Sequence, residues 1–79
     1  MQDLKKAIDL ALGGQWDQAH KIVQDTETRT AYWIHAVLHK IEGDVGNSKY
    51  WYSRAEEMEH FAMEPNDELQ LIRQGLCDT

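Results

Sequence analysis

Residues 31–55, AYWIHAVLHKIEGDVGNSKYWYSRA, decide the fold, because two helical patterns meet there at one glycine. Before the glycine, apolar residues recur three and four positions apart, the spacing of one face of an α-helix. These residues are Ile34, Val37, Leu38 and Ile41. We predict a helix over residues 29–42 that stops at Gly43, since glycine readily adopts the left-handed conformation of a helix C-cap.

The helix after this turn is predicted to follow Asp44, whose side chain is a preferred N-cap. It is expected to end before Pro65, which a helix interior does not tolerate. Its buried line is predicted to be Trp51, Ala55, Met58 and Ala62. Residues 29–63 therefore form a predicted hairpin, with Trp33 and Trp51 assigned to its core.

A similar hairpin is predicted over residues 2–26. Its first helix, over residues 4–12, ends at Gly13-Gly14, and its second runs from about residue 15 to residue 25. The apolar residues at helical spacing in the two helices are Leu4, Ala7, Ile8, Ala11 and Leu12, and then Trp16, Ala19, Ile22 and Val23.

The last predicted element is a short C-terminal helix over residues 66–76, capped by Asn66 or Asp67. No strand-like alternation appears anywhere in the sequence. We therefore expect an all-α fold, with two stacked helix-turn-helix hairpins and a short C-terminal helix in one domain of residues 1–79.

The two hairpins share one pattern. Aligning Gly14 with Gly43 pairs small with small and large with large residues at an offset of 29, as stacked hairpins require. The aromatic start at residues 31–33, the Gly43-Asp44 turn and the finish YWYSRA at 50–55 resemble the tetratricopeptide repeat. This resemblance implies two stacked hairpins that serve as a scaffold for binding peptides, and it is silent on the partner.

Three short blocks carry a second resemblance. WIHA at 33–36, EGD at 42–44 and YWYSRA at 50–55 are similar to blocks of a small bacterial family of uncharacterised proteins. That resemblance implies no activity.

The net charge of −6 comes entirely from the C-terminal third of the chain. Residues 1–54 carry seven basic and seven acidic side chains, whereas residues 55–79 carry one basic and seven acidic side chains. This balance argues against nucleic acid, because affinity for nucleic acid comes from neutralised phosphates. We interpret the acidic segment as a solvated helix face, and the alternative is a docking surface for a basic partner.

The single cysteine, Cys77, cannot form an intramolecular disulfide, which favours a reducing cytoplasm. No run approaches the roughly eighteen apolar residues of a membrane span, and Met1-Gln2-Asp3 opens no signal peptide. We expect a soluble, cytoplasmic chain that contacts no membrane.

His35, His39 and Glu42 share one strip of the helix over residues 29–42, and Tyr32 borders them. Two imidazoles and a carboxylate at this spacing are able to bind one metal ion. Three ligands on one helix make a weak site, however, and His20 is interpreted as exposed helix surface. We therefore expect no metal and no cofactor, and interpret the strip as polar surface or as a hydrogen-bonded cluster that joins the next helix through Asn47, Tyr50 or Arg54.

Tyr50 and Arg54 lie one turn apart in the following helix. They are expected either to rest on each other or to recognise an anionic group. The predicted function is a protein- or peptide-binding helical module, with no catalytic residues. Its candidate contact residues are Tyr32, His35, His39, Glu42, Tyr50 and Arg54.

The alternative function, from another class, is a small-molecule- or metal-dependent enzyme that uses His35, His39 and Glu42. A small core also suggests a weak homodimer through the first or the last helix. Sedimentation at several concentrations tests the dimer, and a single monomer mass up to high micromolar concentration would exclude it.

Overall fold

The computed structural model describes residues 4–77, and it shows five α-helices and one 3-10 turn in that range. They are α1 (Leu4–Leu12), α2 (Trp16–Gln24), α3 (Arg29–Glu42), α4 (Val45–Ala55), η1 (Met58–His60) and α5 (Pro65–Cys77). No strand occurs among the described residues, so the all-α prediction is confirmed. None of these helices combines the length and the apolar composition needed to cross a bilayer.

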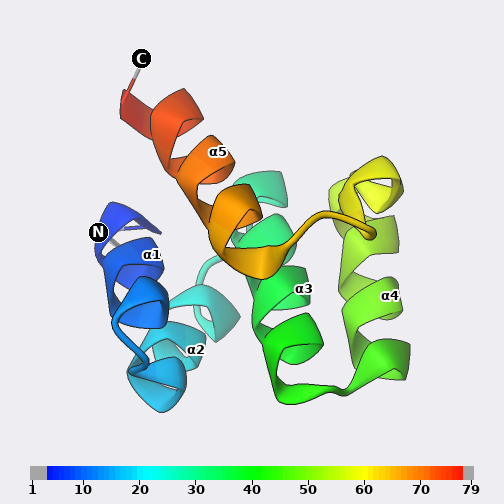
Figure 1. Ribbon diagram of the computed structural model, residues 1–79, viewed down its shortest axis with the longest axis horizontal. Coiled ribbons are helices and arrows are strands. Elements are labelled where there is room, and N and C mark those ends of the chain that lie inside the picture. The colour runs from blue at the N-terminus through cyan, green and yellow to red at the C-terminus, as the bar shows by residue number, and fades with distance from the viewer. Residues whose placement is uncertain (1–3, 78–79) are drawn as a thin grey trace.

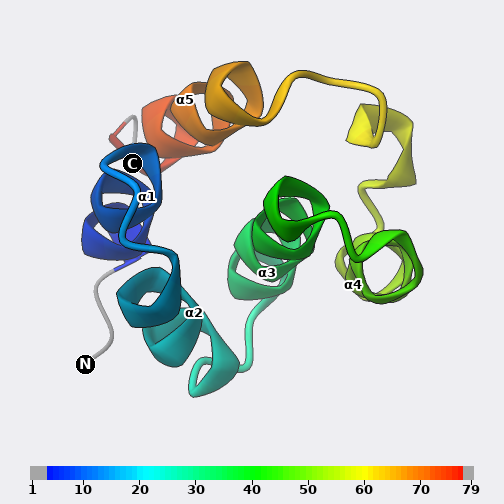
Figure 2. The ribbon, with the colours of Figure 1, turned by 60° about the horizontal axis from the view of Figure 1, so that its bottom comes forward.

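The helices pack in the predicted pairs. α1 packs against α2, and α3 runs antiparallel to α4 beside it (Figure 1). α3 lies in the middle, with α2, α4 and α5 packed around it (Figure 2). A helix with neighbours on several sides is buried around most of its circumference. Both histidines of α3 are consequently buried, so of the two interpretations given to this strip, polar surface does not hold for His35 and His39.

The turn between α3 and α4 forms as predicted. Gly43 is left-handed, with φ 88°, and the N–H of Asp44 donates to the carbonyl of His39 at 2.9 Å. The Asp44 carboxylate accepts from the N–H of Asn47 at 3.2 Å and so caps α4. Two local residues are therefore enough to close one helix and open the next.

The predicted extension of α4 to Ala62 is wrong, because α4 ends at Ala55 and the next residue, Glu56, is left-handed with φ 58°. The segment then turns back, and the Lys40 Nζ donates to the carbonyls of Phe61 and Met63, both at 2.9 Å. A continuing helix would carry these carbonyls away from Lys40. The tertiary contact therefore prevails over the local helical pattern.

α5 begins at Pro65, earlier than Asn66 or Asp67. The cap is Glu64, whose carboxylate accepts from the N–H of Asp67 at 3.1 Å. Proline suits the first helical position because its missing N–H would have no partner there.

The faces of α4 also differ from the prediction. The buried line is Ser48, Tyr52 and Ala55, whereas Trp51 is only partly buried and Met58 is 44% exposed. Trp33 is partly buried as well. The sequence pattern does not indicate that Tyr52 is buried, because its polar hydroxyl suggests a surface position. A buried hydroxyl nevertheless needs only one suitable hydrogen-bond partner.

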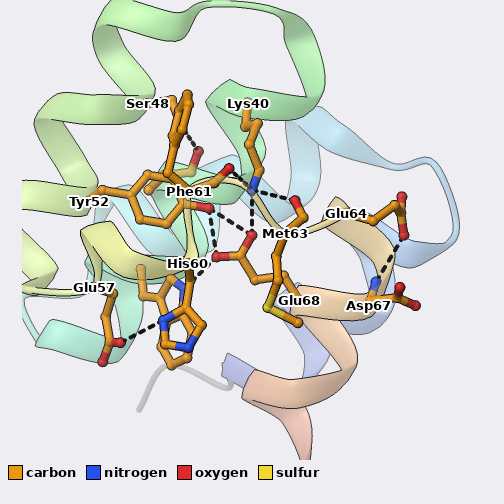
Figure 3. Close-up of polar contacts among 12 residues, drawn as sticks. Lys40, Ser48, Tyr52, Glu57, His60, Phe61, Met63, Glu64, Asp67 and Glu68 are labelled. Carbon is orange, nitrogen blue, oxygen red and sulfur yellow. Dashed lines mark hydrogen bonds and ion pairs between the residues drawn. The ribbon is translucent and has the colours of Figure 1, made fainter.

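That partner is Glu68, a completely buried carboxylate in α5. It accepts from the Tyr52 hydroxyl at 2.6 and 2.7 Å and from the Lys40 Nζ at 2.6 Å (Figure 3). It also accepts from the Trp33 Nε1 at 2.7 Å. We call these four residues the Glu68 cluster. The interpretation of the whole acidic segment as a solvated face is therefore wrong at Glu68. Its carboxylate, in α5, instead forms hydrogen bonds with residues of α3 and α4.

Candidate functional site

Three histidines meet where α2 packs against α3. His20 comes from α2, and His35 and His39 come from α3. One ring nitrogen from each lies within 4.8 Å of one from each of the others. We call these residues the histidine cluster. The prediction that His20 is exposed helix surface was wrong, because Ala19 and Val23 pack α2 against its neighbours and bring the partly buried His20 to the edge of α3.

Two tryptophan rings enclose the histidine cluster. Trp16 stacks on His20 with centroids 4.7 Å apart and 11° between the planes, and Trp51 stacks on His35 at 4.1 Å and 13°. Trp16 is itself held by its Nε1, which donates to the carbonyl of Leu38 at 2.6 Å. The rings therefore restrict how His20 and His35 can turn.

Glu42 contacts the third histidine. Its Oε1 lies 2.6 Å from the Nδ1 of His39. Asp44 lies close by, but its carboxylate accepts from both the backbone and the side chain of Asn47, and these bonds lower the pKa of Asp44. Glu42 is thus the carboxylate that orients His39.

The expected polar link from this strip to α4 through Asn47, Tyr50 or Arg54 is not observed among residues 4–77. The hydrogen bond of His39 stays within α3, and the cluster contacts α4 through the stacking of His35 on Trp51. Asn47 instead donates to Asp44 and Tyr50 accepts from Arg54, so their polar groups are used within α4 and its cap.

Burial governs the charge of the cluster. Loss of hydration, the largest cause, and then the neighbouring His20 and His39 together lower the pKa of His35 to about 4. Burial is also the main cause that lowers the pKa of His20, with His39 the next. A charged imidazole is disfavoured wherever water is excluded and other imidazoles are near, so both effects favour the neutral form of His20 and His35.

A second group of candidate residues lies beside the cluster, on the outer side of α4. The Arg54 guanidinium lies over Tyr32 at 4.8 Å, over Trp51 at 5.4 Å and over Tyr50 at 5.9 Å. Its Nη1 donates to the Tyr50 hydroxyl at 3.1 Å, and this bond is the main cause that raises the pKa of Arg54. We call Tyr32, Tyr50, Trp51 and Arg54 the aromatic–arginine face. The predicted contact between Tyr50 and Arg54 is confirmed.

The six candidates thus fall into two adjoining groups. His35, His39 and Glu42 belong with the histidine cluster, and Tyr32, Tyr50 and Arg54 belong to the aromatic–arginine face. Trp51 joins the two groups because its ring contacts both His35 and Tyr32. Sequence reasoning missed His20, Trp16 and Trp51 as site residues, and only the packing of α2 and α4 against α3 brings them together.

Comparisons of the chain with protein-family models, with curated protein sequences and with solved structures give no match. The fold and the two groups of residues define the molecule as a small all-α domain, and its function has to be inferred from the residues themselves.

Proposed function

We propose that this chain is a helical protein-binding module that holds a carboxylate-bearing segment of a partner protein on its aromatic–arginine face. The observation that carries the proposal is the placement of Arg54, an exposed cation with three aromatic rings packed around it. A guanidinium pairs with carboxylates through parallel N–H donors.

The rings prepare the arginine for binding. Tyr32, Tyr50 and Trp51 hold the side chain through cation–π contacts, and Tyr50 itself is 52% exposed. An arginine that is already ordered loses less conformational freedom when a partner arrives. Arginine, tyrosine and tryptophan are also the residue types that contribute most to binding energy at protein interfaces.

The charge near this face favours an acidic partner. Arg29, at the start of α3, is exposed and donates to the carbonyl of Ala55 at 3.1 Å, so a second guanidinium lies at the same end of α4 as Arg54. A segment that brings a carboxylate to this pair of guanidinium groups is therefore the complementary partner.

Two surface hollows, of about 370 and 270 Å³, lie between α1 and α2 and between α3 and α5, away from the aromatic–arginine face. The resemblance of residues 31–55 to a tetratricopeptide hairpin supports the same proposal, because such hairpins are scaffolds for peptides.

The test is fluorescence anisotropy with short labelled peptides in which every Glu is either kept or replaced by Gln. We expect the acidic peptides to bind. Arg54→Gln should lower their affinity about tenfold or more, as expected for the loss of a charge-assisted hydrogen bond. Lys5→Gln, an exposed lysine of α1, is the matched control. Equal binding of acidic and neutral peptides, or unchanged affinity in Arg54→Gln, would contradict the proposal.

A further inference from the structure

The histidine cluster supports a second, separate inference. We propose that His20, His35 and His39 bind one divalent transition-metal ion of the kind that prefers imidazole ligands, with zinc as the representative ion. The inference is independent of the aromatic–arginine face, since it rests on other side chains and other chemistry. Imidazole nitrogens suit zinc, copper and nickel in proteins.

The distances allow the three rings to converge on one ion. In a tetrahedral centre with Zn–N bonds of about 2.0 Å, the ligand nitrogens lie about 3.3 Å apart. The nitrogens of the histidine cluster already lie within 4.8 Å of one another. Small shifts of the rings within their stacking planes close the difference, and His20, which is only partly buried, is the ring expected to shift.

The ring nitrogens of His20 and His35 have no hydrogen-bond partner among residues 4–77, whereas His39 is paired with Glu42. His35 is only 4% exposed, yet the ring nitrogens of His20 and His35 are not among the fully buried unsatisfied atoms, so a water molecule or an ion can reach their lone pairs. An ion in the middle of the cluster would use the lone pairs of His20 and His35 together.

The surroundings of the cluster match those of known metal-binding histidines. A metal-bound imidazole usually donates its other N–H to a carboxylate, which fixes the ring and makes it a better ligand. Glu42 holds the Nδ1 of His39 at 2.6 Å and leaves Nε2 for the ion. Trp16 and Trp51 fix the planes of His20 and His35 by stacking.

Two other groups in the described chain have potential ligand atoms at similar distances, and both are weaker. In the group His39, Glu42 and Asp44, the Asp44 carboxylate caps α4 and Glu42 is bound to His39. The group Glu57, Glu59 and His60 offers one imidazole, and its His60 Nδ1 lies 3.0 Å from Glu57. Only the histidine cluster combines three imidazoles with an orienting carboxylate.

The site differs from the one considered on sequence grounds, where three ligands on a single helix made binding improbable. His20 adds a ligand from a second helix, and Glu42 is assigned the role of orienting His39 instead of binding the ion. Three protein ligands leave a fourth position for water or for a group brought by another molecule, as in zinc sites that are open to solvent.

The experiment is calorimetric titration of the full chain, purified without a polyhistidine tag, with zinc chloride and separately with nickel chloride. We expect one ion per chain with a Kd of about 1 µM or tighter. His20→Gln should weaken binding at least about tenfold, and Glu42→Gln should weaken it by about 10- to 100-fold at unchanged stoichiometry. His60→Gln removes a histidine outside the cluster and should change nothing.

Cobalt chloride provides a readout that a structural role alone would not produce. A four-coordinate, nitrogen-rich cobalt(II) centre absorbs visible light far more strongly than cobalt in water, and His20→Gln should abolish this band while circular dichroism shows an intact fold. His20 is chosen because it is the least buried of the three. Binding weaker than about 100 µM, or equal binding by the wild type and His20→Gln, would overturn the proposal.

Discussion

The Oε1 atom of Glu68 lies 2.6 Å from the Nζ of Lys40, and the Glu68 side chain has no exposed surface at all. The same carboxylate also accepts from Tyr52 and Trp33, while Lys40 donates to two backbone carbonyls (Figure 3). Each charge therefore has several partners. Such a pair adds little over a well-packed apolar core, but removing one member leaves the other buried without compensation.

Glu68→Gln is predicted to lower the free energy of unfolding by about 3–5 kcal/mol, because it leaves the Lys40 ammonium without the negative charge that compensates it. Urea denaturation followed by circular dichroism measures the change. Glu59→Gln, an exposed change in the same acidic segment, is the control and is expected to stay within about 0.5 kcal/mol of wild type. A loss below about 1 kcal/mol for Glu68→Gln would mean that the carboxylate is hydrated.

Tyr52→Phe and Tyr50→Phe form a matched pair that separates the two aromatic environments. Tyr52 donates its hydroxyl to buried Glu68, so its loss is predicted to cost about 1–3 kcal/mol. The Tyr50 hydroxyl accepts from Arg54 at the surface, and its loss is expected to cost less than about 0.5 kcal/mol. Similar losses for the two variants would show that the buried face of α4 is assigned wrongly.

His35 is predicted to make the stability of the metal-free protein depend on pH. Its pKa is about 4 in the folded chain and 6.5 in the unfolded chain. Below pH 6.5, His35 therefore binds a proton in the unfolded chain that it does not bind in the folded chain. Stability is complete above about pH 6.5 and falls by up to about 3 kcal/mol as the pH is lowered to 4. His20 and His39 oppose the charge on His35, and Glu42 beside His39 is the nearby acidic group.

Denaturation in a chelating buffer at several pH values between 4 and 7.5 measures this slope. His35→Gln should lessen it even if its overall stability is lower, while His60→Gln should keep it. An unchanged slope in His35→Gln would assign the pH dependence to other groups.

The helix ends near Gly43 and Asp44 were predictable because both residues act on their own backbone. The burial of Glu68 and the position of His20 were not, since each depends on contacts between helices that are distant in sequence. An acidic residue in an acidic segment and a histidine in an amphipathic helix are both usually exposed. The strip of candidate residues on α3 could therefore be predicted from the sequence. The approach of His20 from α2 and the stacking of His35 on Trp51 could not, because they depend on how the helices pack.

Two glycines with different backbone conformations test how much the left-handed conformation matters for stability. Gly43 has φ 88° and Gly75 lies within α5, yet an added Cβ would meet nothing within 4 Å at either position. Any difference between Gly43→Ala and Gly75→Ala must therefore come from backbone conformation rather than from crowding.

Gly43→Ala should destabilise the chain by about 1 kcal/mol, because alanine is strained in the left-handed region. Gly75→Ala should stabilise it by about 0.5–1 kcal/mol, because alanine loses less freedom than glycine inside a helix. Gly43→Asn should fall between Gly43→Ala and wild type, since asparagine tolerates this conformation better than alanine. Urea midpoints for the three variants give the comparison, and a neutral Gly43→Ala would mean that the α3–α4 turn does not need a left-handed residue.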